Sequence, residues 1–171
     1  MPYIAYLREP TDRIVSLYYY LLKVSRHPVL TMIQENGWSL LDFVQSGCVS
    51  DVDNDHTRYL SGVGQRVPIG QMGEEHLEQA KRNIVEHDIL LGLTERFDAS
   101  LVRIARHLEW RSIGYTVQNR SEGRPTADAV DPATLAAIRA ANPYDLELYE
   151  FARARLEQQI AAEREQIDAD L

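Results

Sequence analysis

The chain has 171 residues, a formal net charge of -8, and a composition of 44% hydrophobic and 26% charged residues. This composition is typical of one soluble globular domain and excludes disorder of the whole chain. The acidic balance argues against general nucleic-acid binding, which needs a basic surface. No apolar run approaches the roughly 20 residues of a membrane span. The single cysteine, Cys48, excludes an internal disulfide.

The first predicted unit is a strand followed at once by a helix. Tyr3 to Leu7 has the short aromatic and branched pattern of a strand, Pro10 suits the first turn of a helix, and apolar residues recur at helical spacing as far as Leu22. Short helices are predicted at 38–46 and about 57–60. The segment 62–73 is predicted to be a flexible loop, because its four glycines match neither a P-loop nor a dinucleotide fingerprint.

A second strand-turn-helix unit follows. The spacing predicts a helix over 74–86, a buried strand over 88–93 and a helix from Thr94 to about 108. Alternating units of this kind indicate an α/β fold with a parallel sheet. Residues 112–118 are predicted to form another strand and 119–125 a polar loop. Helices at 132–141 and from Pro143 to about 167 make the C-terminal part helix-rich, so that 142–171 is a C-terminal helix of a single domain over 1–171.

Three side chains of the first unit point to an anion site. In an open α/β sheet, ligands gather at the carboxyl ends of strands and at helix N-termini. Arg8 follows the first strand, Arg13 falls in the first turn of the next helix, and Ser16 lies three residues further on. Two guanidinium groups, a hydroxyl and free backbone amides would together make a phosphate pocket. The alternative is that Arg8 and Arg13 are surface charges paired with Glu9 and Asp12.

The sequence YLREPTDRIVSLYYYLL, Tyr6 to Leu22, carries a family resemblance. It resembles the 3'-phosphate-binding segment of sulfotransferases that use 3'-phosphoadenosine 5'-phosphosulfate (PAPS), in the branch of the heparan sulfate 2-O- and 6-O-sulfotransferases. The pattern is Arg, an acidic residue, Pro, two residues, Arg, two residues, Ser, then tyrosines. The likeness continues in chain order through four further stretches: NDHTRYLSG (54–62), AKRNIVEHDILLGLTERFD (80–98), NRSEGRP (119–125) and NPYDLELYEFA (142–152).

The resemblance implies roles for particular residues. Arg8 and Ser16 fall on the positions that grip the 3'-phosphate of the nucleotide, and Arg13 would shape the same pocket. The loop carrying Asn119, Ser121, Gly123 and Arg124 falls where related enzymes close a second segment over that phosphate. Both regions lie in net-basic stretches of this acidic chain, since residues 1–30 hold four basic against two acidic side chains and residues 101–130 hold five against three.

The resemblance also implies a fold and an activity. The expected fold is a P-loop-NTPase-like parallel sheet flanked by helices, and the expected activity is transfer of a sulfuryl group from PAPS to a hydroxyl of a carbohydrate-type acceptor, without a metal. The chain begins inside a strand that comes late in the related enzymes. We therefore expect an N-terminally truncated domain that lacks the 5'-phosphosulfate loop and the catalytic base, and that associates as a homo-oligomer through the surface left exposed.

Several alternatives remain open from the sequence. The chain could instead be a non-catalytic helical assembly module that uses its charged C-terminal helix, or a degenerate nucleotide-binding remnant. Arg58 either touches an acceptor or is buried against Asp51 or Asp53, and Glu95 is favoured as a first-turn carboxylate over a catalytic base. His56 is expected to be an exposed loop residue. The absence of a membrane anchor in the chain suggests a cytoplasmic location.

Overall fold

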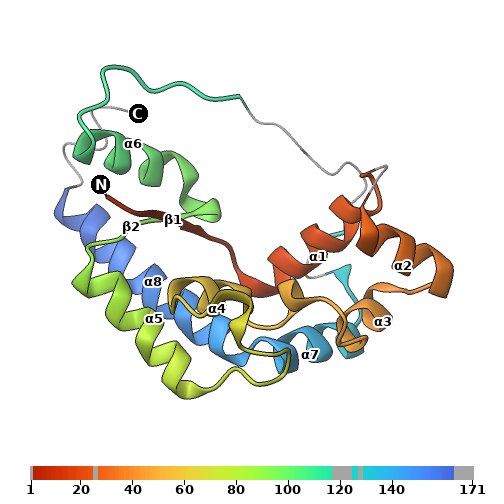
Figure 1. The fold of residues 1–171 in the computed structure, drawn as a ribbon. Helices are drawn as coiled ribbons and strands as arrows, with labels where there is room; N and C mark the ends of the chain where they lie inside the picture. Colours follow the sequence, from red (N-terminus) through yellow and green to blue (C-terminus); the bar gives the residue numbers. More distant parts are fainter. Residues whose placement is uncertain (1, 25–26, 117–124, 127–128, 164–171) are drawn as a thin grey trace.

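The computed structural model describes residues 2–24, 27–116, 125–126 and 129–163. Two short strands, β1 (Ile4–Leu7) and β2 (Leu90–Leu93), form a parallel pair in which Ile4 lies opposite Leu90 and Leu7 opposite Leu93. Around them lie mostly helices, so the predicted α/β class with a parallel sheet is confirmed at that level (Figure 1). The finer P-loop-like architecture stays a prediction.

The helices connect in an order close to the predicted one. Their bounds are α1 (Pro10–Leu21), α2 (Pro28–Asn36), α3 (Leu40–Gln45), α4 (Asp55–Leu60), α5 (Glu74–Glu86), α6 (Phe97–His107), α7 (Pro132–Ala141) and α8 (Pro143–Ala162), with short 3-10 turns at Ser50–Val52, Gly64–Arg66 and Thr94–Arg96.

The sheet lies between helices on both of its faces. α6 covers one face, and α5 and α8 lie on the other (Figure 1). Leu7, Leu91 and Leu93 pack into one buried cluster with apolar residues of α5 and α8, including Leu77, Ile84, Leu148 and Leu156. The apolar side chains of α8 are therefore used inside the domain.

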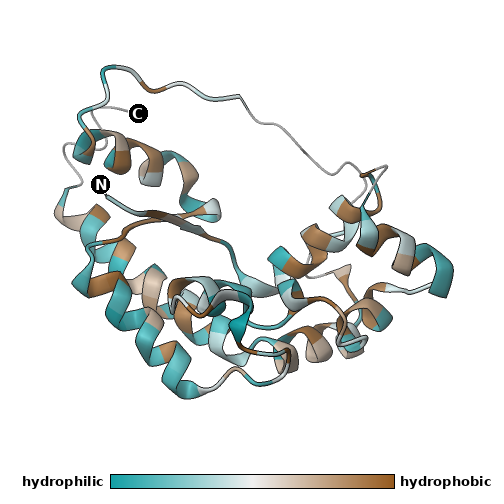
Figure 2. Ribbon diagram, in the orientation of Figure 1, coloured by the Kyte–Doolittle hydropathy of each residue, from teal (hydrophilic) through white to brown (hydrophobic). Residues whose placement is uncertain are grey.

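A second apolar cluster lies at the other end of the molecule, where α1 packs against α2, α3 and α7. It contains Ile14, Val15 and Tyr18 of α1 together with Ile33, Phe43 and Ile138. Figure 2 shows the alternation of hydrophobic and hydrophilic positions along these helices. Because α1 starts at the carboxyl end of β1 and runs into this second cluster, it links the two parts of the fold.

Two predictions of secondary structure need correction. The nine-residue helix α2 was not predicted, although His27 caps it through Val29 N and Gly37 ends it with a left-handed φ of 62°. The predicted strand at 112–118 is wrong over residues 112–116, which are exposed and have no regular structure. An isolated apolar segment cannot form a strand without a partner edge. Among the described residues, no helix has the length and apolar character needed to span a bilayer.

Candidate functional site

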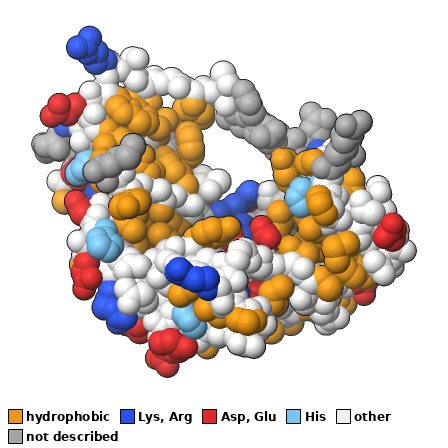
Figure 3. All heavy atoms as spheres, viewed as in Figure 1, with side chains coloured by type: hydrophobic (Ala, Val, Ile, Leu, Met, Phe, Trp, Pro, Cys, Tyr) orange, Lys and Arg blue, Asp and Glu red, His pale blue; other side chains and the backbone are white. Residues whose placement is uncertain are grey.

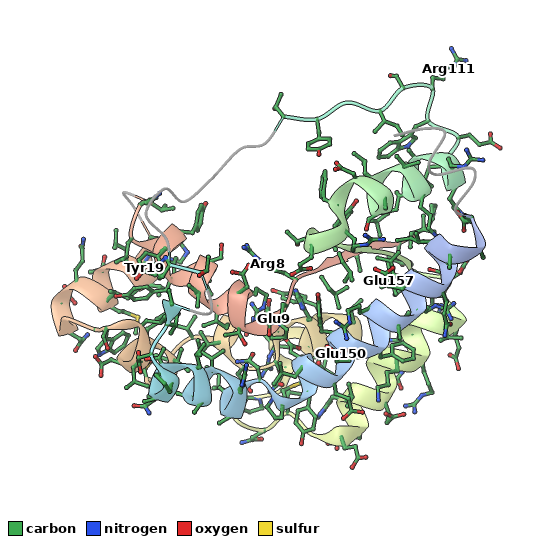
Figure 4. All side chains as sticks on the ribbon, turned by 180° about the vertical axis from the view of Figure 1, so that it is seen from behind. Arg8, Glu9, Tyr19, Arg111, Glu150 and Glu157 are labelled. Atoms are coloured by element: carbon green, nitrogen blue, oxygen red, sulfur yellow. The ribbon has the colours of Figure 1, made fainter. Side chains whose placement is uncertain are left out.

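Arg8 lies at the carboxyl end of β1, where the chain turns into α1. Figure 3 shows an opening between two parts of the molecule, with hydrophobic side chains along one side of it and charged side chains at its lower edge. In Figure 4, Arg8 points toward the open side between α1 and α6, whereas Glu9 points the opposite way. The guanidinium is partly accessible, with 26% of the side chain exposed. This position fits the general rule for ligand sites in parallel sheets.

The backbone on both sides of Arg8 is held by the residues that follow β2. Thr94 donates its hydroxyl to the carbonyl of Leu7 at 3.2 Å, and the amide of Glu9 donates to Glu95 Oε1 at 2.9 Å. Burial and the hydrogen-bonded Glu95 carboxylate raise the pKa of Tyr149. Glu95 thus fixes the turn that carries Arg8, a role that the sequence did not reveal.

The side chain of Arg8 folds back onto α1. Its Nε donates to Asp12 Oδ2 at 2.5 Å, and Nη2 contacts the same oxygen. Asp12 and Ser16 are four residues apart in α1 and lie on one face, so the contact to Asp12 holds the guanidinium near the face of α1 that carries Ser16. A guanidinium has five N–H donors, and the contacts to Asp12 use two of them. Arg8 can therefore still offer paired donors to an anion near Ser16.

The amides of Glu9 and Asp12, near the start of α1, are not free. Pro10 has no N–H, the amide of Asp12 donates to Glu9 Oε2 at 2.7 Å, and the amide of Glu9 is bonded to Glu95. The carboxylates compete for the same helix end that an anion would use. An anion at this site therefore depends on side chains, above all on Arg8.

The side chain of Arg13 points toward α4 and α8 and forms ion pairs there. Its Nη1 lies 3.3 Å from Asp55 Oδ2, and its Nη2 lies 2.8 Å from the Asp51 carbonyl and 3.6 Å from Asp145 Oδ2. Its side chain is only 13% exposed. The structure thus gives Arg13 partners that join α1 to the rest of the fold, and its predicted place beside the phosphate stays a prediction.

Helices α4 and α8 cap each other at their N-termini, and we call this arrangement the reciprocal cap. Each helix starts in one of the stretches that carry the family resemblance. Asn54 Oδ1 accepts the amides of Tyr144 and Asp145 at the start of α8, at 2.9 and 3.1 Å. In return, the carboxylate of Asp145 accepts the amides of His56 and Thr57 at the start of α4, at 3.1 and 2.7 Å. Each helix start is stabilised by a side chain of the other. The same Asp145 contacts Arg13, so this cap supports α1 as well.

Arg58 is fully buried, as one of the two hypotheses for it predicted. Its Nη2 bonds to Asp53 Oδ2 at 2.5 Å, and its Nη1 donates to the carbonyls of Gly64 and Val67. Asp53 also accepts the amide of Gly70 at 2.9 Å. The pair therefore anchors the segment 62–73, and the burial against Asp53 is confirmed. The flexibility of that segment stays a prediction.

His56 is not the exposed loop residue that was expected. It lies in α4, where its Nδ1 is buried without a hydrogen-bond partner in the structure. Burial lowers the pKa of His56 to about 4, while the nearby Asp145 opposes this shift. Burial likewise raises the pKa of Asp55 to about 6, against the opposing effect of Arg13.

Replacing Asp55 with asparagine should make the protein more sensitive to acid. The raised pKa of Asp55 adds stability that is present at low pH and is lost as the pH rises through about 6. The lowered pKa of His56 has the opposite effect, since its stability is lost as the pH falls from about 6.5 toward 4. In the wild type the two effects on the free energy of unfolding offset each other between about pH 4 and pH 6.

In Asp55→Asn only the effect of His56 remains. Its free energy of unfolding should fall by about 2 kcal/mol more than that of the wild type between pH 7 and pH 4.5. Urea denaturation at the two pH values measures this difference. An equal loss in both proteins would show that the two groups do not oppose each other.

The second predicted phosphate-binding segment is not tested. Asn119, Ser121, Gly123 and Arg124 lie outside the described residues. In the parts of the chain that are described, no three His, Cys, Asp or Glu side chains come together in a way that could hold a metal ion.

Comparisons with known proteins give one informative match. No protein-family model matches the sequence, and no solved structure does. The chain is similar to a protein named heparin sulfate O-sulfotransferase from Drosophila melanogaster, with 29% identity over 168 residues. The match covers 91% of this chain and 48% of the relative, so the chain spans about half the length of that relative. A sulfotransferase-like relationship is thus supported.

The same match contradicts the cytoplasmic location expected from the sequence, because a heparin sulfate O-sulfotransferase is a Golgi-lumenal enzyme. The expectation rested on the absence of a membrane anchor from these 171 residues. An absence of that kind carries no information about the compartment.

Proposed function

We propose that this chain binds the nucleotide of a PAPS-dependent sulfotransferase through the 3'-phosphate, and that the enzyme sulfates a hydroxyl of a carbohydrate acceptor. The observation that carries the proposal is the placement of Arg8 and Ser16. Arg8 lies in the turn between β1 and α1, Ser16 lies in α1 one turn beyond its partner Asp12, and both belong to a stretch that matches the family pattern. The similarity to a heparin sulfate O-sulfotransferase over most of the chain supports the same activity.

The donor set suits a phosphate monoester. Arg8 keeps three N–H donors beyond its contacts to Asp12, and the half-buried Ser16 can rotate its hydroxyl toward a ligand. Paired guanidinium donors match phosphate oxygens in geometry and in charge. The neighbouring Asp12 carboxylate lowers the affinity for any anion, and it also holds the guanidinium in place.

Two pairs of side chains would act together on the bound nucleotide. Arg8 and Ser16 would hold the 3'-phosphate, while Thr94 and Glu95 would keep the Arg8 turn in position. The nucleotide supplies the sulfuryl group and leaves as the 3',5'-bisphosphate. Holding its far end sets the direction in which the sulfur faces an acceptor hydroxyl, and orientation of this kind contributes strongly to the rate of a transfer reaction.

A thermal-shift comparison of two nucleotides tests the proposal. 3'-Phosphoadenosine 5'-phosphate (PAP) should raise the melting temperature of the full chain, because a ligand that binds only the folded state stabilises it. Adenosine 5'-phosphate, which lacks the 3'-phosphate, should give a much smaller shift at the same concentration. Equal shifts, or no shift with PAP, would contradict a 3'-phosphate site.

A further inference from the structure

Three aromatic rings contact one another in a row. The ring centroids of Tyr6 and Phe97 are 5.4 Å apart, and those of Phe97 and Tyr115 are 4.7 Å apart. We call these three residues the aromatic row. They come from β1, from the start of α6 and from the segment that follows α6, so residues far apart in sequence converge here.

The row is exposed, although it is built into the fold. Tyr6 is 36% exposed and Tyr115 is 50% exposed. A Cβ atom at Gly92 would lie 2.5 Å from the ring of Tyr6, so the strand next to β1 leaves room for this ring only because it has glycine there. At the other end of the row, the Tyr115 hydroxyl bonds to the carboxylate of Asp98. Fixed but exposed aromatic rings are typical of binding surfaces.

The row lies on the Arg8 side of the sheet. Side chains alternate along a strand, so Tyr6 faces away from the buried Leu7 and toward the side that Arg8 occupies. Tyr6 contacts Phe97 of α6, so its ring lies on the α6 side of the sheet. Figure 4 shows that Arg8 also points to this side, between α1 and α6.

We propose that the aromatic row of Tyr6, Phe97 and Tyr115 is the binding surface for the sugar rings of the acceptor. This inference rests on the proposed function, because it names where the acceptor of that reaction lies. Sugar rings present C–H faces that pack on aromatic rings and hydroxyls that bond to nearby polar groups, which the carboxylate of Asp98 and the hydroxyl of Tyr115 supply.

The geometry favours a sugar over a nucleotide base. The planes of Tyr6 and Phe97 are inclined by 37°, and those of Phe97 and Tyr115 by 66°. Such tilted rings form no parallel slot for a flat base, whereas they offer successive faces to puckered rings. The Asp98 carboxylate beside Tyr115 disfavours densely sulfated chains at this end of the row. The occupant should therefore be a saccharide of low sulfation with free hydroxyls.

The test uses a desulfated heparin hexasaccharide and the full chain. Its affinity is measured by NMR titration for the wild type, Tyr115→Leu and Phe97→Leu, and saturation transfer reports which sugar protons contact the protein. Tyr59→Leu is the matched control, since Tyr59 is an exposed tyrosine of α4 outside the row. The PAP affinity of every variant is measured in parallel by calorimetry.

We expect Tyr115→Leu and Phe97→Leu to bind the hexasaccharide about fivefold more weakly, with unchanged PAP affinity, and Tyr59→Leu to behave as the wild type. Absence of hexasaccharide binding by the wild type, or equal affinities in all variants, would overturn the assignment while leaving the nucleotide proposal intact. Weaker PAP binding by Tyr115→Leu would overturn it in favour of a base-binding role. PAP could bind neither the wild type nor any variant while Tyr115→Leu and Phe97→Leu still bind the hexasaccharide more weakly. That result would support the saccharide site and contradict the nucleotide proposal.

Discussion

Replacing Arg8 with alanine should weaken PAP binding by about 2 kcal/mol or more, which is roughly a 30-fold increase in the dissociation constant. The side chains carry this site, because the amides of Glu9 and Asp12 at the start of α1 already donate to carboxylates. Isothermal titration calorimetry on the full chain measures the effect directly.

Two further variants make the Arg8 experiment specific. Arg8→Lys keeps the charge but loses the paired donors, so its affinity should lie between those of the wild type and Arg8→Ala. Arg153→Ala removes an exposed arginine of α8 that pairs with Glu150, and it should bind PAP like the wild type. An equal loss of PAP affinity in Arg8→Ala and Arg153→Ala would show that only the overall charge of the chain matters.

Replacing Arg58 with alanine should lower the free energy of unfolding by about 3 to 5 kcal/mol, the usual cost of leaving one member of a buried ion pair alone. Arg58 is 0% exposed, and its removal leaves the buried carboxylate of Asp53 without its cation. The substitution also removes the donor that bonds to the carbonyls of Gly64 and Val67. Urea denaturation at neutral pH measures the loss.

The matched control for Arg58 is Arg66→Ala. Arg66 is an exposed arginine whose hydrogen bonds go to the nearby carbonyls of Gly62 and Val63. Its replacement should change the free energy of unfolding by no more than about 0.5 kcal/mol. A loss below about 1 kcal/mol for Arg58→Ala would contradict the role of this pair as the anchor of segment 62–73.

Local signals in the sequence predicted most of the elements. The strand and helix of each unit follow from periodicity and from Pro10, and the Arg58–Asp53 pair joins residues only five positions apart. The prediction of free amides at the start of α1 was wrong for a local reason. Glu9 directly precedes the helix and caps it by accepting the amide of Asp12. A carboxylate at that position competes with an anionic ligand for the same amides.

Contacts between distant segments could not be predicted. The reciprocal cap joins Asn54 to Asp145, which is 91 positions away, and nothing in either stretch specifies the other. The strand register does indicate one such contact. In the parallel register Leu7 lies opposite Leu93, so Arg8 and Glu9 come level with Thr94 and Glu95. Aligning the two strand ends would have suggested that the second turn supports the first.

The most direct test of the central claim is a crystal structure of the chain with PAP. The 3'-phosphate oxygens should lie within hydrogen-bonding distance, about 3 Å, of the Arg8 guanidinium and the Ser16 hydroxyl. Electron density that placed this phosphate away from α1, or the 5'-phosphate in its position, would contradict a 3'-phosphate site at Arg8.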